Sequence, residues 1–176
     1  MRYFVFAIGA MALVGCGGTS GSAGGGPGNI DGATANQDAH VQHNLTMLNM
    51  YRAQTGAAPL TLDDNLTAFS IKAAQEFESS GTAHGYFGAQ SQSMAIWSEG
   101  FCSGAGENQA PGSDWNINSD EDATIDAILK LMFDEGPGGG HYENIVNPKF
   151  TRVGVGLVVT STGGLWFSND FSNACP

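Results

Sequence analysis

Basic residues are scarce in this sequence. Of its 176 residues, 6 are Lys or Arg and 17 are Asp or Glu, which gives a formal net charge of -11. Affinity for nucleic acids depends largely on Lys and Arg side chains that neutralise phosphates and release counterions. Nucleic acids and anionic lipid head groups are therefore poor candidate partners. The apolar content of 41% excludes a wholly disordered chain, so a globular domain is expected.

The N-terminal apolar stretch, residues 4–14, is too short to cross a bilayer as a helix. It follows the basic residue Arg2, and the two together are typical of a secretory signal. The stretch ends in Leu13-Val14-Gly15-Cys16, which resembles the bacterial lipobox. We therefore interpret residues 1–15 as a lipoprotein signal peptide and Cys16 as an acylated residue that anchors an exported protein to a bacterial membrane. The domain would lie on the non-cytoplasmic side. An ordinary signal peptide, with Cys16 incidental, is the alternative.

The segment after Cys16 contains little that a fold could bury. Gly, Ser, Thr, Ala and Pro dominate it from Gly17 to about Asn36, a composition typical of a flexible linker. We predict that residues 16–39 form a tether and that residues 40–176 form one globular domain. This arrangement would hold the domain at a distance from the membrane.

Cysteine is also rare, with three in the chain. If Cys16 carries lipid, Cys102 and Cys175 remain, and an oxidising compartment favours a disulfide between them. An alternative interpretation makes Cys102 the nucleophile of a strand-turn-helix elbow. Glycines follow Cys102 at once, where that elbow requires a helix, so the disulfide is the prediction that we adopt.

Apolar periodicity predicts three helices. The first covers residues 43–54 and stops at Gly56. The second runs to Gly81 and begins with Thr61 and Asp64 as a capping pair, and the third begins with Ser119 and Asp122 in the same roles.

Residues 153–159 change to the alternating pattern of a strand, and Gly163-Gly164 predicts a turn before a partner strand over residues 165–171. Gly154 and Gly156 leave one face of the first strand nearly bare, so a helix can lie close against it. Helices followed by an antiparallel hairpin indicate an α+β domain.

Four histidines are present, and they fall into two groups. His40 and His43 have the spacing of a metal-binding pair, but no third ligand is near them in sequence, so we interpret them as solvated. His84 and His141 follow the second and third predicted helices. We expect both on loops at helix C-termini, where functional groups are often presented and where the helix dipole favours a protonated imidazole.

Two acidic residues have comparable settings. Glu107 leaves a Gly-rich loop in Gly106-Glu107-Asn108, and Glu135 closes the third predicted helix, where the helix dipole disfavours a carboxylate that has no partner. Together, His84, Glu107, Glu135 and His141 would suit a divalent cation such as zinc, with Glu107 or Glu135 as candidate general base for a bound water. Spacing alone leaves open whether the four converge.

A longer run supplies a family resemblance. Residues 141–156, HYENIVNPKFTRVGVG, resemble the signature of the CAP superfamily of cysteine-rich secretory, antigen 5 and pathogenesis-related type 1 proteins, in its bacterial SCP-like form. Further landmarks appear in family order, and the match covers nearly all of residues 40–173. They are Asn49 to Arg52, Pro59-Leu60, Ala83-His84, Gly106-Glu107-Asn108 and Met132-Phe133-Asp134-Glu135.

The resemblance implies a three-layer α-β-α sandwich with a central antiparallel sheet and an open cleft. The family's cleft tetrad maps onto His84, Glu107, Glu135 and His141. In relatives that bind a metal, the two histidines are the ligands, and the two glutamates orient the site or hold water. The sequence departs from the family at Met132-Phe133, where many eukaryotic members have Trp-Tyr, and at Glu143-Asn144, which replaces Thr-Gln.

The resemblance also narrows the function, because enzymatic activity is seldom claimed in this family. We expect a non-catalytic binding module at the cell envelope, whose cleft takes a lipid, a metal or a protein partner. One alternative is a zinc-dependent hydrolase acting on peptides or esters, although the sequence lacks the metalloprotease run His-Glu-x-x-His. A second alternative is a purely structural tetrad that ties loops together.

Overall fold

A computed structural model describes residues 35–117 and 120–176. The predicted signal peptide, Cys16, most of the predicted tether and Ser119 lie outside the described residues. The elements in chain order are α2 (Ala39–Thr55), β1 (Thr61–Leu62), α3 (Asp64–Ser80), α4 (Gly85–Gln92), the 3-10 helix η1 (Ala95–Ser98), β2 (Ala105–Ala110), α5 (Glu121–Asp134), α6 (Gly140–Val146), β3 (Arg152–Val159) and β4 (Leu165–Ser172).

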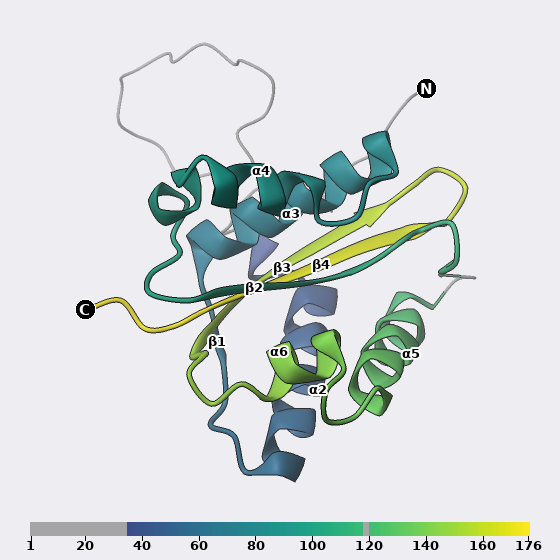
Figure 1. Ribbon diagram of the computed structural model, residues 1–176. Helices are drawn as coiled ribbons and strands as arrows, with labels where there is room; N and C mark the ends of the chain where they lie inside the picture. The colour runs from purple at the N-terminus through teal and green to yellow at the C-terminus, as the bar shows by residue number, and fades with distance from the viewer. Residues whose placement is uncertain (1–34, 118–119) are drawn as a thin grey trace, which may run out of the picture.

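The elements form three layers. A four-stranded sheet with the order β1-β3-β4-β2 lies between α3 and α4 on one side and α2, α5 and α6 on the other (Figure 1). β3, β4 and β2 are antiparallel, and Gly163-Gly164 forms the turn of the predicted hairpin. β1 pairs in parallel with β3, so the sheet is mixed at this edge rather than wholly antiparallel. The predicted α+β sandwich is confirmed.

Aspartates begin all three long helices. Asp38, Asp63 and Asp120 each accept hydrogen bonds from backbone N–H groups of the following first turn. The prediction that Thr61 caps the second helix was wrong, because Thr61 is in β1 and the nearer Asp63 bonds Asn65 N and Leu66 N. The predicted ends are confirmed, since Gly56 and Gly81 both have the left-handed conformation that stops a helix.

The packed region begins before residue 40. Asn36 is buried, its Nδ2 donates to Asp64 Oδ1 (2.7 Å), and its Oδ1 accepts from Thr67 Oγ1 (2.6 Å). These contacts fix the start of the described chain against the first turn of α3. The packed part of the described chain therefore includes Asn36, four positions before the predicted start of the domain at residue 40.

Apolar side chains fill both spaces between the layers. The larger cluster lies between the sheet and α2, α5 and α6, and it includes Leu48, Ile128, Ile145, Phe167 and Phe171. The smaller cluster lies on the other side, where Leu66, Phe69 and Ala73 of α3 pack with Ile96 and Phe101. No helix of the described part of the chain is long and apolar enough to cross a membrane.

The two strand glycines bring α3 unusually close to the sheet, as predicted. A Cβ added at Gly154 would lie 2.1 Å from the backbone carbon of Leu66, and one added at Gly156 would lie 2.1 Å from Ser70 O. Backbone of the helix therefore packs directly on backbone of the strand, in the space that side chains would otherwise need.

A fully buried arginine connects α2 to the segment that follows α6. Arg52 Nε donates to Ala58 O (2.7 Å), its Nη1 to Ile145 O (2.7 Å) and Asn147 O (3.0 Å), and its Nη2 to Phe150 O (2.9 Å). The guanidinium thus fixes the C-terminal end of α6. Because α6 carries His141, Arg52 supports the site from behind.

The predicted disulfide between Cys102 and Cys175 is confirmed, with the two Cα atoms 5.3 Å apart. It joins the loop before β2 to the C-terminal end of the chain. Arg152 lies beside it, with Nη2 3.2 Å from Cys102 Sγ and Nη1 2.6 Å from Asp63 Oδ2. The nucleophile interpretation of Cys102 is therefore excluded.

Candidate functional site

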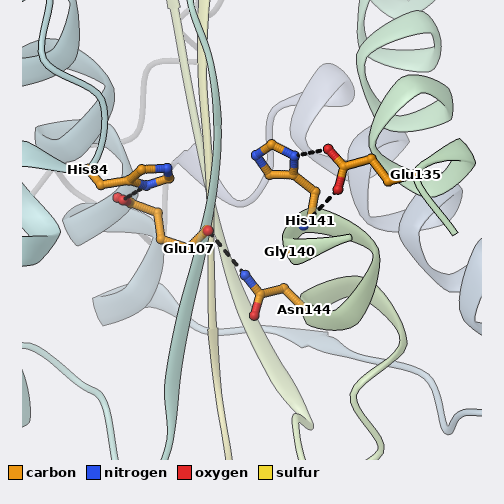
Figure 2. Close-up of a pocket in the computed structure, with 6 residues that line it drawn as sticks. All are labelled: His84, Glu107, Glu135, Gly140, His141 and Asn144. Carbon is orange, nitrogen blue, oxygen red and sulfur yellow. Dashed lines mark hydrogen bonds and ion pairs between the residues drawn. The ribbon is translucent and has the colours of Figure 1, made fainter. Parts of the chain in front are cut away.

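A pocket of about 230 Å³ lies beside β2, the edge strand of the sheet. Its lining contains the four residues singled out in the sequence and two more: His84, Glu107, Glu135, Gly140, His141 and Asn144 (Figure 2). The structure therefore brings the four together, although they are spread over 58 positions of the chain. Each of the two histidines forms a hydrogen bond with one of the two glutamates.

His84 and Glu107 form the first pair. His84 Nδ1 lies 2.7 Å from Glu107 Oε2, and His84 N donates to Gln109 Oε1 (2.7 Å). His84 has a positive φ of 60°, which few residues other than glycine adopt, and the bond to Gln109 helps to hold it there. The pKa of His84 is raised by its hydrogen bond with Glu107, while partial burial acts in the opposite direction.

Glu107 is buried, and the exposed fraction of its side chain is 1%. While Oε2 faces His84, Oε1 accepts from Gln109 Nε2 (3.2 Å) and lies 3.4 Å from Ser168 Oγ. Burial raises the pKa of Glu107, and the hydrogen bond with His84 lowers it without overcoming the effect of burial. The pKa values of His84 and Glu107 are thus both raised, so each group binds a proton more strongly than it would in water.

A second buried carboxyl lies behind Glu107. Ser168 Oγ lies 3.0 Å from Asp170 Oδ2 and 3.4 Å from Glu107 Oε1, so its one proton is shared between the two carboxyl groups, and Asp170 is wholly inaccessible to solvent. Burial raises the pKa of Asp170 well above its usual value, and the neighbouring Glu107 raises it further. Two carboxyl groups this close in the interior disfavour a full negative charge on both.

His141 and Glu135 form the other pair. His141 Nδ1 lies 2.5 Å from Glu135 Oε1, and His141 N donates to Glu135 Oε2 (3.1 Å). Burial raises the pKa of Glu135, but the hydrogen bonds from His141 outweigh it, and the net pKa is lowered. The carboxylate that the dipole of α5 disfavours therefore has the partner that the sequence suggested.

The predicted location of the histidines at helix C-termini was wrong. His84 is the N-cap of α4, and His141 is the second residue of α6. A helix N-terminus carries partial positive charge and disfavours an imidazolium. The short helices α4 and α6 were not predicted, so the local dipoles had the opposite sign to the one expected. For His84, the hydrogen bond with Glu107, rather than a helix dipole, raises the pKa of the ring.

Three amides of the site were missed in the sequence. Asn108 Nδ2 donates to His141 O (3.1 Å), and Asn144 Nδ2 donates to Asn108 Oδ1 (2.9 Å) and Glu107 O (3.1 Å). Strand alternation was the available signal, because it places Gln109 on the same face as Glu107 and Asn108 on the opposite face. Side chains on one face of β2 thus form hydrogen bonds with His84, and a side chain on the other face forms one with His141.

The neutral rings have the chemistry of metal ligands. When Nδ1–H donates to a glutamate, the lone pair of Nε2 is free to bind a cation. Figure 2 shows the two nitrogens that do not face a glutamate turned toward each other across the pocket. Within residues 35–117 and 120–176, no group of three or more His, Cys, Asp or Glu side chains is placed to hold a metal ion. A metal ion in this pocket would therefore have two imidazoles, and no third side chain of these types, as ligands from the described residues.

The remaining histidines have partners that the sequence did not indicate. His40 Nδ1 lies 2.7 Å from Asp122 Oδ1, and His43 Nε2 lies 2.7 Å from Asp126 Oδ1. The hydrogen bond with Asp122 raises the pKa of His40, against the effect of burial. The interpretation of this pair as simply solvated was wrong, because both histidines join α2 to α5.

The geometry and the fold agree with a comparison against known families. The family model described as CAP, the cysteine-rich secretory protein family, matches residues 45–171. The chain belongs to this family. The CAP match includes the tetrad and all four strands of the sheet. A comparison with curated proteins found no match.

Solved structures confirm the CAP fold. An extracellular SCP-domain protein of Bacillus anthracis superposes with a TM-score of 0.54 at 21% identity, over 76% of this chain and 40% of that one. An outer surface protein of Borrelia burgdorferi has a TM-score of 0.59 at 17% identity, over 77% and 93% of the two chains. NaASP2, solved with Zn²⁺, has a TM-score of 0.55 at 13% identity, over 79% and 88%. The chain thus spans less than half of the Bacillus protein.

Proposed function

We propose that this protein is an exported, lipid-anchored CAP-domain protein whose cleft binds a divalent metal ion, zinc by preference, as part of a binding module at the cell envelope. One observation carries the metal proposal. Two imidazoles face each other across the pocket, and each has its Nδ1 held by a carboxylate. Histidine ligands of zinc commonly donate their second ring N–H to a carboxylate, which fixes the tautomer and strengthens the ligand.

Two ligands leave a zinc site open. Structural zinc sites in proteins are closed by four side chains, whereas a site that keeps free positions can take water or an exogenous group. With His84 and His141 as ligands, the remaining positions would face the pocket. This supports a role in capturing a ligand that carries a metal-binding atom, and the identity of that ligand is not implied by the residues.

The carboxylates favour binding over hydrolysis. A general base must be free to accept a proton from water. Both oxygens of Glu107 are engaged, by His84 on one side and by Gln109 and Ser168 on the other, and both oxygens of Glu135 face His141. The zinc-dependent hydrolase is therefore the less supported alternative.

Export and anchoring rest on different observations. The sequence at Cys16 resembles a lipobox, the fold neighbours include an extracellular protein and an outer surface protein, and Cys102 and Cys175 form a disulfide. Disulfides persist in oxidising compartments. Together these features support a domain on the outer side of a bacterial membrane, attached through acylated Cys16.

Zinc titration tests the metal proposal. Isothermal titration calorimetry of the purified protein is expected to give one zinc site, and His84→Ala/His141→Ala is expected to weaken it by more than the roughly 10–100-fold that loss of an outer-shell partner costs. His40→Ala/His43→Ala is the matched control, since it removes two histidines outside the pocket. Equal losses in both double variants would contradict the proposal. If zinc does not change the melting temperature of the wild type, and if His84→Ala has a lower melting temperature than the wild type, the tetrad is structural.

The affinity for zinc is also expected to depend on pH. Zinc requires neutral imidazole, so affinity should fall by about tenfold per pH unit for each ring that becomes protonated. Because Glu107 raises the pKa of His84, this loss should begin above the ordinary value of 6.5. The stability of the zinc-free protein should depend on pH in the opposite direction. The protonated pair stabilises the fold below pH 6.5, and this contribution disappears as the pH rises through the raised pKa.

Glu107→Gln separates these effects. It removes the carboxylate that raises the pKa of His84, so the midpoint of zinc loss should move to lower pH. Glu99→Gln is the control, since Glu99 pairs with Lys72 (3.4 Å) away from the pocket. Zinc affinity that is constant from about pH 8 to pH 5 would contradict ligation by histidine.

A further inference from the structure

Two large apolar side chains are exposed beside η1. The exposed fraction is 64% for Met94 and 43% for Trp97, and we call these two residues the apolar tip. Between them, Ile96 is buried in the smaller core cluster with Phe69 of α3. The segment is therefore fixed to α3 by one residue and presents its neighbours to the surroundings.

The backbone at Met94 is strained. Its φ of 60° lies in the left-handed region, which a residue with a Cβ adopts only at a cost in free energy. Neither burial nor a side-chain cap compensates, because Met94 is exposed and caps η1 without a side-chain hydrogen bond. The left-handed backbone itself belongs to the turn that ends α4, where Met94 N donates to Ser91 O (3.1 Å), so the feature that packing within the domain does not explain is the exposed apolar side chain.

The segment of the chain that carries the apolar tip is nearly uncharged. From Ser79 to Gly106, in a chain with 17 acidic residues, Glu99 is the one charged residue apart from the titratable His84. Glu99 is itself paired with Lys72. This part of the surface can therefore approach another surface without the repulsion that the net charge of -11 would otherwise produce.

The described chain begins near the N-terminal end of α3, and the segment that follows η1 packs on that end too. Asn36 is bonded to Asp64 and Thr67, while Gly100, shortly after η1, packs on Asn65. Asn36 follows Cys16 by 20 positions. A Gly/Ser-rich chain of that length has a root-mean-square span of about 25 Å, which is less than the diameter of a domain of this size. An anchor at Cys16 would therefore hold this end of α3 close to the bilayer, in place of the distance from the membrane that the composition of the tether alone suggested.

From these observations we propose that the apolar tip inserts into the interfacial layer of the membrane that carries the acylated Cys16. The inference rests on the proposed lipid anchor and adds an orientation, with the α3 side of the sandwich toward the bilayer. Tryptophan favours the membrane interface, where its ring is partly wetted. The anchor confers an effective concentration on the order of millimolar, so a contact of two side chains suffices. The contact is apolar, in agreement with the scarcity of basic residues.

The test uses the full acylated chain, reconstituted into phosphatidylcholine vesicles with or without brominated acyl chains, which quench tryptophan on contact. Trp97 fluorescence is obtained by subtracting the signal of Trp97→Phe, which retains Trp115 and Trp166. We expect the Trp97 signal to shift to shorter wavelength in vesicles and to lose intensity in the brominated ones. Met94→Asn should reduce that loss and should not weaken the fold, since Asn tolerates the left-handed conformation.

Controls separate the orientation from the anchor. Met50→Gln/Leu131→Gln removes two other exposed apolar side chains, on α2 and α5 across the sheet, and should leave the quenching of Trp97 unchanged. Vesicle flotation, compared with Cys16→Ser, reports the anchor itself. A protein that floats without quenching of Trp97 overturns the orientation and leaves the anchor intact. A protein that does not float overturns both.

Discussion

Replacing Arg52 by methionine is expected to lower the free energy of unfolding by at least about 4 kcal/mol, which is large for one substitution. The guanidinium bonds four backbone carbonyl oxygens, three of which belong to residues 145–150. Methionine has a similar length and no donor, so these carbonyls would lose their partners in the interior. Each such loss costs about 1–3 kcal/mol, and losses at one site are not fully additive.

Urea unfolding, followed by circular dichroism, measures the effect of Arg52→Met. Lys149→Met is the matched control, because it makes the same change of side chain at an exposed position in the segment that Arg52 fixes. The control should stay within about 0.5 kcal/mol of the wild type. If the two variants proved equally stable, the buried guanidinium would not be what holds this segment.

The variant Gly154→Ala is expected to be destabilised by at least about 3 kcal/mol, near the upper end of what one added methyl group costs. Its Cβ would lie 2.1–2.5 Å from backbone atoms of Leu66 and Thr67. Backbone in the first turn of α3 cannot rotate aside as a side chain can, so α3 would have to move away from the sheet. That movement would open the smaller core cluster.

Thermal unfolding of Gly154→Ala checks this prediction, and Gly88→Ala provides the contrast. Gly88 lies inside α4, and a Cβ there would meet nothing within 4 Å. Alanine at such a position is expected to stabilise the protein by roughly 0.4–1 kcal/mol, because it restricts the unfolded chain. Opposite signs for the two glycines are the expected result. A Gly154→Ala variant as stable as the wild type would mean that α3 does not pack directly on β3.

Local patterns predicted the elements whose signals are themselves local. The sequence predicted the glycines that end α2 and α3 and the alternating pattern of β3. Each of these signals depends only on residues that are close together in the sequence. The start of α3 could not be assigned correctly, because Thr61 and Asp63 are both good caps and β1 decides between them. Where two local choices compete, pairing with a distant strand selects one.

Some features of the site could be predicted from the sequence and others could not. The family resemblance identified both histidines and both glutamates, but it did not indicate that α4 and α6 begin at these histidines. Strand alternation could have indicated the position of Gln109. No signal in the sequence indicated that Arg52 is buried, since a charged side chain is expected at the surface. The partners of His40 are 82 positions away, and no pattern in the sequence indicates so distant a contact.

The pocket lies at an edge strand that both outer layers share. His84 belongs to α4 on the α3 side of the sheet, and His141 belongs to α6 on the opposite side (Figures 1 and 2). An ion held by both would connect two layers that the sheet separates. Its binding free energy would be added to the stability of the native sandwich according to the ratio of free zinc to the dissociation constant. The rigidity of the cleft would then follow the concentration of free zinc around the protein, and a chelator would relax it without breaking a covalent bond.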